Sequence, residues 1–161
     1  MRRKEQEITD ESAIKTIIEK AAVCRLGMVD GNQPYIVPLC FGYHDNVLYF
    51  HSALEGQKID FIRKNPNVCF EFDLIAETLE STNACDWSME YQSVIGFGKA
   101  VFIESSEEKR KALGTIMAQY SNRKFQFPDN KLKITAVIKV QIKSITGKQS
   151  IGFGDAEKVG S

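Results

Sequence analysis

The 161-residue sequence has no excess of charge of either sign, because 21 Lys and Arg residues balance 21 Asp and Glu residues. This balance argues against a broad nucleic-acid-binding surface, which depends on a basic patch or stripe. The two short basic clusters, at residues 2–4 and 109–111, have acidic neighbours, and we interpret them as solvated faces. We therefore expect no nucleic-acid partner.

Long apolar runs are also missing. No stretch approaches the roughly 20 apolar residues that a membrane-spanning helix requires. The first residues, MRRKEQEITDES, are charged and contain no apolar core of the kind found in signal peptides. We expect no membrane partner.

Cysteine is scarce and irregularly spaced. The four residues are Cys24, Cys40, Cys69 and Cys85, and no CxxC pair occurs. Three of them lie in apolar runs that are typical of strands, so we expect buried, reduced thiols. Reduced cysteines indicate a cytoplasmic location.

Motifs of several enzyme classes are absent. The only histidines are His44 and His51, with no acidic residue at ligand spacing, so we predict no metal site. No GxSxG nucleophile motif occurs. The residues Gly96-Phe97-Gly98 lack the third glycine and the following helix of a dinucleotide fingerprint. These absences disfavour hydrolase and Rossmann-type functions.

What the sequence does contain is a succession of β-rich runs with few helical segments. We predict six strands, at residues 23–29, 35–43, 47–50, 68–74, 91–103 and 135–142. Three helices are predicted, at about residues 10–22, 56–64 and 105–120. Because hairpins dominate over alternating β–α units, the pattern favours a small, mainly antiparallel barrel with a few helices.

Length and local features refine this prediction. The chain fits a single domain over residues 1–161, with a core at 8–150 and tails at 1–7 and 151–161. Pro38 cannot donate a ladder hydrogen bond, which predicts an edge position for its strand. Gly96 and Gly98 suggest a bulge or a barrel bend. The polar residues 77–90 predict a long loop.

The point where the third predicted strand passes into a helix is the first candidate site. A hydroxyl on Ser52 and an ammonium on Lys58 flank Gly56. Together with the free N–H groups at the start of a helix, these groups are complementary to a phosphate. An ordinary strand-to-helix connection with a surface lysine is the alternative.

The preceding segment, residues 37–42, is the second candidate. Its backbone N–H and C=O groups could contact the polar edge of a planar heterocycle. A plain core strand is the alternative.

These runs, in this order, resemble a known family. The segments QPY, VPLCFGY, LYFHSALEGQK, NPNVCFEFD and SVIGFGKA are similar to the FMN-binding split-barrel family typified by pyridoxamine 5′-phosphate oxidase. The HSAxxGxK pattern, Ala84-Cys85, the YQSV phrase and the ITGK ending are more similar to the branch that includes Nim-type nitroimidazole-resistance proteins. The resemblance covers about residues 10–150.

The resemblance implies a six-stranded antiparallel split β-barrel that binds FMN between the subunits of a homodimer. It also assigns cofactor-binding positions. The family's flavin-ring segment matches Val37, Pro38, Leu39, Cys40, Phe41 and Gly42. The pair that reaches the ribityl-phosphate arm matches His51 and Ser52. The Arg-Lys pair that grips the phosphate matches Gln57 and Lys58, and a glutamine on the long strand matches Ser93.

This sequence departs from the oxidase at two places. Gln57 stands where the family has arginine, and the oxidase's C-terminal tryptophan and arginine have no counterpart after Ser144. These departures argue against oxidation of pyridoxamine phosphate. We therefore expect an FMN-dependent oxidoreductase that passes electrons from a small-molecule donor to a small flat acceptor such as a nitroimidazole.

His51 is the catalytic candidate, as a proton donor whose unperturbed pKa is about 6.5. A hydrogen-bonded structural histidine is the alternative. A non-catalytic flavin- or haem-binding carrier or sensor is the alternative function.

Overall fold

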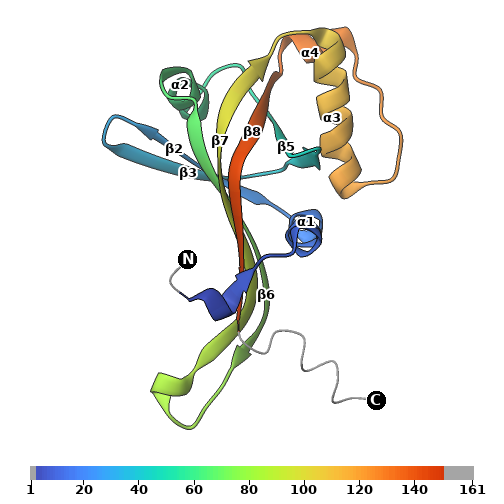
Figure 1. Ribbon diagram of the computed structural model, residues 1–161. Coiled ribbons are helices and arrows are strands. Elements are labelled where there is room, and N and C mark those ends of the chain that lie inside the picture. Colours follow the sequence, from blue (N-terminus) through green and yellow to red (C-terminus); the bar gives the residue numbers. More distant parts are fainter. Residues whose placement is uncertain (1–2, 151–161) are drawn as a thin grey trace. The chain divides into compact units, whose positions relative to one another are not determined.

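The computed structural model describes residues 3–150, which form mainly antiparallel β-sheet with a few helices, as predicted (Figure 1). The strands are β1 (Glu7–Ile8), β2 (Cys24–Asp30), β3 (Gln33–Leu39), β4 (Gly42–His44), β5 (Val47–Ser52), β6 (Asn67–Leu79), β7 (Ser88–Ile103) and β8 (Ala136–Gln149). The α-helices are α1 (Glu11–Lys20), α2 (Gln57–Lys64), α3 (Ser106–Tyr120) and α4 (Asp129–Lys133). Two 3₁₀ turns are η1 (Lys4–Gln6) and η2 (Ala84–Asp86).

Two compact units divide the described residues. The first unit combines the residues up to Ala21 with Glu71–Ile95 and the residues from Thr146 on. The second unit comprises Ala22–Phe70 and Gly96–Ile145. That the chain is a single domain stays a prediction, and the predicted tail at 151–161 lies outside the described residues.

The described strands form a single sheet. The order is β3-β2-β6-β7-β8-β5-β4, and β1 pairs with β8 outside this path. Strand β3 lies at one edge, which confirms the position that Pro38 predicts. The chain itself joins β3 to β4, the strand at the other edge, through Cys40 and Phe41.

Two tight turns set the hairpins of the second unit. Gly31 has a φ of 56°, which suits the turn between β2 and β3. Asp45 and Asn46 have φ angles of 48° and 62°, the pair of positive values that a type I′ hairpin turn requires. Both turns are marked in the sequence, by Asp30-Gly31-Asn32 and by His44-Asp45-Asn46.

Glycines on the inner face of β7 allow close packing. A Cβ on Gly96 would overlap the ring of Phe70, and a Cβ on Gly98 would lie 2.6 Å from the carbonyl oxygen of Gln141. Strand β7 is continuous from Ser88 to Ile103. The two glycines therefore make room for neighbouring residues, a role that the sequence pattern did not indicate.

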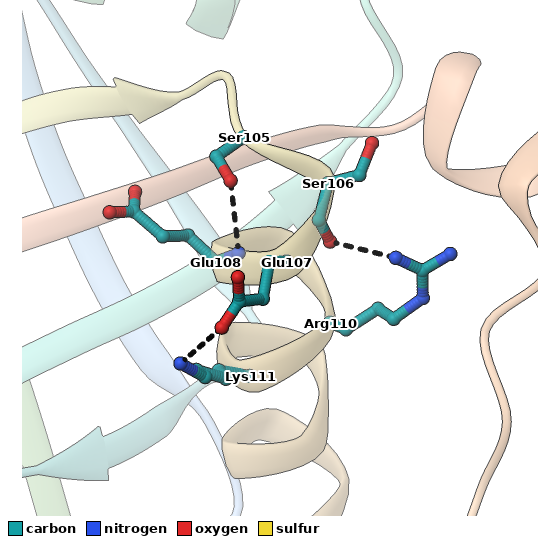
Figure 2. Close-up of polar contacts among 6 residues, drawn as sticks. All are labelled: Ser105, Ser106, Glu107, Glu108, Arg110 and Lys111. Atoms are coloured by element: carbon teal, nitrogen blue, oxygen red, sulfur yellow. Dashed lines mark hydrogen bonds and ion pairs between the residues drawn. The ribbon is translucent and has the colours of Figure 1, made fainter.

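Helix α3 begins as its sequence predicts. The Ser105 hydroxyl accepts a hydrogen bond from the Glu108 N–H at 3.5 Å, which is one half of a capping box. Figure 2 shows this contact beside the ion pair of Lys111 and Glu107, at 2.8 Å, and the bond from Arg110 to the Ser106 carbonyl. The carboxylates of the first turn also suit the positive end of the helix dipole.

The strand count differs from the prediction, because the described residues contain eight strands in place of six. The predicted strand at 35–43 is two strands separated by Cys40 and Phe41: β3 pairs with β2, and β4 pairs with β5. The apolar run continues across this break, so hydrophobicity alone does not reveal it. Strand β1 has only two residues and was missed.

The predicted long loop at 77–90 was wrong. Strand β6 extends to Leu79 and β7 begins at Ser88, so only residues 80–87 connect them, with η2 in their middle. The side chains at 77–80 and 82–89 are exposed, and a strand exposed on both faces shows no apolar alternation. Helix α4, which is five residues long and begins directly after Pro128, was also missed.

None of the four cysteines forms a disulfide, as predicted, but burial was predicted wrongly for three of them. Cys24 is buried, whereas Cys40, Cys69 and Cys85 are exposed. Cys40 lies in the break after edge strand β3, and Cys69 points to the outer face of β6. Among residues 3–150, no helix is long and apolar enough to span a membrane.

Candidate functional site

The strand–helix corner, Ser52–Lys58, joins β5 to α2. Gly56 has a φ of 125°, a conformation that suits glycine, and it serves as the N-cap of α2 without a side-chain cap. The first amides that bond to the helix are those of Ile59 and Asp60, which donate to the Gly56 carbonyl at 2.9 and 3.1 Å. The N–H groups of Gln57 and Lys58 precede these bonds, so the positive end of α2 is available to an anion.

Lys58 adds a cation at this end of the helix. Its side chain is half-buried, and burial lowers the pKa of its ammonium below the ordinary lysine value. No carboxylate forms an ion pair with Lys58 in the part of the chain that the structure describes. A half-buried cation without a partner is unfavourable unless a ligand supplies the counter-charge.

An open backbone edge adjoins the corner. One edge of β5 pairs with β8 as far as Ser52, which lies opposite Ala136. On the other edge, β4 covers β5 only as far as Tyr49, opposite Gly42. Within residues 3–150, no strand therefore pairs with this second edge of residues 50–52. Unpaired N–H and C=O groups are available there to a ligand.

The first half of the ring-lining segment, Val37–Gly42, also has a backbone edge that no described strand covers. Residues 37–39 end edge strand β3, whose only partner strand in the sheet order is β2. Val37 and Leu39 are half-buried, and Pro38 and Cys40 are exposed. This half can face a ligand.

The second half of the ring-lining segment is enclosed. Phe41 is fully buried, and a Cβ on Gly42 would lie 2.6 Å from backbone atoms of Thr115 and Ile116 in α3. Gly42 is thus required for the packing of α3. The side chain of Phe41 belongs to the core, so only backbone groups of these two residues could contact a ligand.

His51 and Ser52 point in opposite directions. Leu48 and Phe50 are fully buried, and side chains alternate along a strand, so Ser52 shares their face and His51 lies on the other. His51 lines a pocket of about 300 Å³ between β5, α3 and α4, with Ile116 and Thr135 among its other residues. The two side chains cannot both contact one phosphate.

The remaining predicted residues lie apart from this arrangement or at its rim. Gln57 is the first residue of α2 and is exposed. Ser93 is half-buried in β7 and belongs to the first unit, whereas the other predicted residues belong to the second. The corner and the open β5 edge are continuous at Ser52, and the ring-lining segment ends at Gly42, which pairs with Tyr49 of β5. The role of Ser93 stays a prediction.

Tyr120 is a residue of this region that the sequence did not indicate. Its hydroxyl accepts a hydrogen bond from the Phe41 N–H at 3.0 Å, in the middle of the break between β3 and β4. The two residues are 79 positions apart. No local pattern marks such a contact.

An apolar groove of about 550 Å³ lies on the outer surface of the second unit. It is lined by residues of β2, β3, β6 and β7. Ile36 and Phe97 line this groove and are 62% and 57% exposed. Exposed side chains of this size, gathered in one groove, are typical of an interaction surface.

Comparisons with known proteins show what the chain is similar to. A family model described as pyridoxamine 5′-phosphate oxidase matches residues 10–149. A solved structure of a candidate 5-nitroimidazole antibiotic resistance protein from Bacteroides thetaiotaomicron VPI-5482 is 39% identical, with a TM-score of 0.81. The match covers 89% of this chain and 86% of that one.

More distant structures share the fold. A flavocytochrome from Azotobacter vinelandii has a TM-score of 0.83 at 17% identity, over 100% of this chain and 78% of that one. An FAD and haem binding protein from Mycobacterium smegmatis has a TM-score of 0.84 at 14% identity, over 97% and 80% of the two chains. These likenesses support the expected split barrel.

A protein from Rhizobium meliloti strain 1021, itself uncharacterised, is 38% identical over 55 residues. That match spans 34% of this chain and 36% of the relative, so it carries no information about the remainder of either protein.

Proposed function

Because this chain belongs to the pyridoxamine 5′-phosphate oxidase family, we propose that it binds FMN and passes electrons from a small-molecule donor to a small flat acceptor. A nitroimidazole is the acceptor class that we favour. The support for this class is the 39% identity to the candidate 5-nitroimidazole resistance protein, over most of both chains. Several structures of the same fold are described as FAD-binding proteins, which supports a flavin.

One observation carries the cofactor proposal: beside the uncapped start of α2, the half-buried ammonium of Lys58 forms no ion pair within residues 3–150. The phosphate of FMN would supply the missing counter-charge and accept hydrogen bonds from the N–H groups of Gln57 and Lys58. The Ser52 hydroxyl would donate to the same phosphate or to the ribityl chain. Gln57 would contribute its backbone, since its amide side chain cannot replace the charge of arginine.

The ring-lining segment would hold the flavin ring. Backbone groups at Val37–Cys40, on the free edge of β3, would contact its polar rim. The bound flavin would supply the electron transfer itself. The chain's residues would bind it, orient it and limit access of water to the ring.

His51 would serve the acceptor. Its imidazole lines the 300 Å³ pocket, which has room for a small flat molecule, and a histidine can give up a proton near neutral pH. On this account, His51→Gln slows reoxidation of the reduced protein by a nitroimidazole but leaves FMN affinity unchanged. Equal rates in the two proteins would assign His51 a structural role.

A second copy of the chain would complete the site. The groove containing Ile36 and Phe97 offers an apolar contact surface on the second unit. A cytoplasmic location is part of the same proposal, supported by four cysteines that form no disulfide.

The absorption spectrum of protein purified without added cofactor tests the proposal. FMN predicts a flavin spectrum, and extraction with chromatography separates FMN from FAD. A Soret band would instead select the haem-binding alternative. Anaerobic reduction followed by addition of a nitroimidazole then tests turnover: reduced protein that passes no electrons to any small acceptor would be a carrier or sensor.

A further inference from the structure

We propose that Tyr120 is the positioning residue of the ring-lining segment, and that its hydroxyl fixes the backbone at Cys40 and Phe41 in the geometry that receives the flavin ring. The inference rests on the proposed FMN site. It assigns a role to a residue on α3, far in sequence from both the segment and the strand–helix corner.

The break between β3 and β4 is the place where such a residue acts. Up to Leu39 the chain pairs with β2, opposite Cys24, and from Gly42 it pairs with β5, opposite Tyr49. Cys40 and Phe41 belong to neither ladder. A contact that fixes the backbone at this change of strand therefore also fixes the adjacent groups that face the ligand.

The Tyr120 hydroxyl makes such a contact and links it to a second point. It accepts from the Phe41 N–H at 3.0 Å and donates to the carbonyl oxygen of Ala22 at 3.1 Å. Ala22 lies just before β2, so one hydroxyl links the entrance of β2 to the break. A single oxygen that both accepts and donates holds the two segments at a fixed separation.

Ring packing and helix packing reinforce this link. The rings of Phe41 and Tyr120 meet edge to face, with centroids 6.4 Å apart and an interplanar angle of 83°. One step along the chain, Gly42 lies against the backbone of Thr115 and Ile116 in the same helix. The C-terminal half of α3 thus holds the break at two adjacent residues.

The electrostatics agree with a neutral, bonded hydroxyl. Burial raises the pKa of the Tyr120 hydroxyl, the Phe41 N–H acts in the opposite direction, and the neighbouring thiol of Cys40 raises the pKa further. The hydroxyl therefore keeps the proton that it donates to Ala22 across the physiological range.

The test replaces Tyr120 with Phe, which removes the oxygen and keeps the ring. Tyr49→Phe is the matched control, because the Tyr49 hydroxyl makes no hydrogen bond within residues 3–150, although its ring also packs near α3. We expect Tyr120→Phe to bind FMN roughly three- to tenfold more weakly, because the bonds to the Phe41 N–H and the Ala22 carbonyl are both lost and the break is less well ordered for the ligand. The visible bands of the bound flavin should shift, and exchange of the Phe41 amide in flavin-free protein should accelerate.

The outcomes separate the two proposals. If wild-type protein binds FMN and Tyr120→Phe leaves both the affinity and the flavin bands unchanged, this inference is overturned, whatever happens to the melting temperature. If wild-type protein binds no FMN, the proposed function fails and the inference fails with it. Should Tyr120→Phe unfold, the same substitution is made together with Gly114→Ala, since a Cβ at Gly114 meets no neighbour and alanine favours the helix.

Discussion

Lys58 illustrates how one side chain can be costly for folding and useful for binding. Its ammonium is half-buried without a carboxylate partner in the described part of the chain, so the folded state loses hydration and regains little. A bound phosphate would restore the lost interaction. We infer that the residue is retained for its ligand.

FMN affinity measures this directly. Lys58→Ala should weaken binding about tenfold to a hundredfold, because losing a charge-assisted hydrogen bond costs about 1.5–3 kcal/mol. Riboflavin, which has no phosphate, should bind wild type and variant equally. Lys64→Ala is the control variant, since Lys64 lies on the same helix but pairs with Asp30 at 2.5 Å. An equal loss for riboflavin and FMN would mean that the phosphate lies elsewhere.

Replacing Lys58 should weaken FMN binding but should not lower the stability of the flavin-free protein. The pKa of Lys58 is lower in the folded protein than in the unfolded chain, so the charged form destabilises the fold below that lowered pKa. The penalty should disappear as pH rises through the lowered pKa toward 10.5. Flavin-free Lys58→Met should therefore melt at or above the wild-type temperature at neutral pH, and the difference should shrink at alkaline pH. A lower melting temperature for the variant would contradict an unpaired cation.

At this scale, the corner is easier to recognise in the sequence than the contacts that hold the ring-lining segment. Ser52, Gly56 and Lys58 are close in sequence, so their residue types alone indicate a phosphate site. Phe41 and Tyr120 are brought together by the fold across 79 positions, and a single sequence carries no signal for that contact.

Among the elements, α3 packs on β4 and β5 and holds the end of the ring-lining segment. Two glycines meet at this interface with opposite requirements. A Cβ on Gly42 would clash with the α3 backbone, whereas a Cβ on Gly114, within α3, would contact nothing.

The two alanine variants should shift stability in opposite directions. Gly114→Ala should stabilise the protein by about 0.5–1 kcal/mol through the lower conformational entropy of the unfolded chain. Gly42→Ala should destabilise it by about 1–3 kcal/mol through overpacking. Urea unfolding of both variants checks this, and a stabilised Gly42→Ala would show that α3 lies farther from β4 than described.

The positions of α1, α2, α3 and two hairpins followed from the sequence because their signals are local. The capping residue Ser105 precedes α3, and the turn residues Asp45 and Asn46 precede β5. The end of β6 and the start of β7, at residues 77–79 and 88–89, were not predicted as strand. Their side chains are exposed, and their polar sequence resembles that of a loop. The sequence also did not reveal that the chain stops pairing with β2 before Cys40 and starts pairing with β5 after Phe41, because both sides of this break are apolar.

For the whole molecule, the account requires a second copy of the chain. Phe97 lies on the outer face of β7 and lines the apolar groove, where its exposure would be unfavourable in an isolated chain. A self-association surface would cover it and place two flavin sites in one dimer.

Light scattering of a charge-introducing variant checks this requirement. Phe97→Asp should shift the protein from dimer to monomer and weaken FMN binding, because a buried charge opposes association. Ile134→Asp, at a residue that is 61% exposed and lies outside the groove, should remain dimeric. A Phe97→Asp protein with an unchanged mass would place the interface on another surface.

The central claim is that the corner between β5 and α2 binds the phosphate of a flavin, with the end of β3 beside its ring. Calorimetric titration of flavin-free wild-type protein with FMN, in parallel with riboflavin, tests it most directly. The account predicts saturable binding of FMN that is tighter than that of riboflavin by at least tenfold. No heat with FMN, or equal affinity for the two compounds, would contradict it.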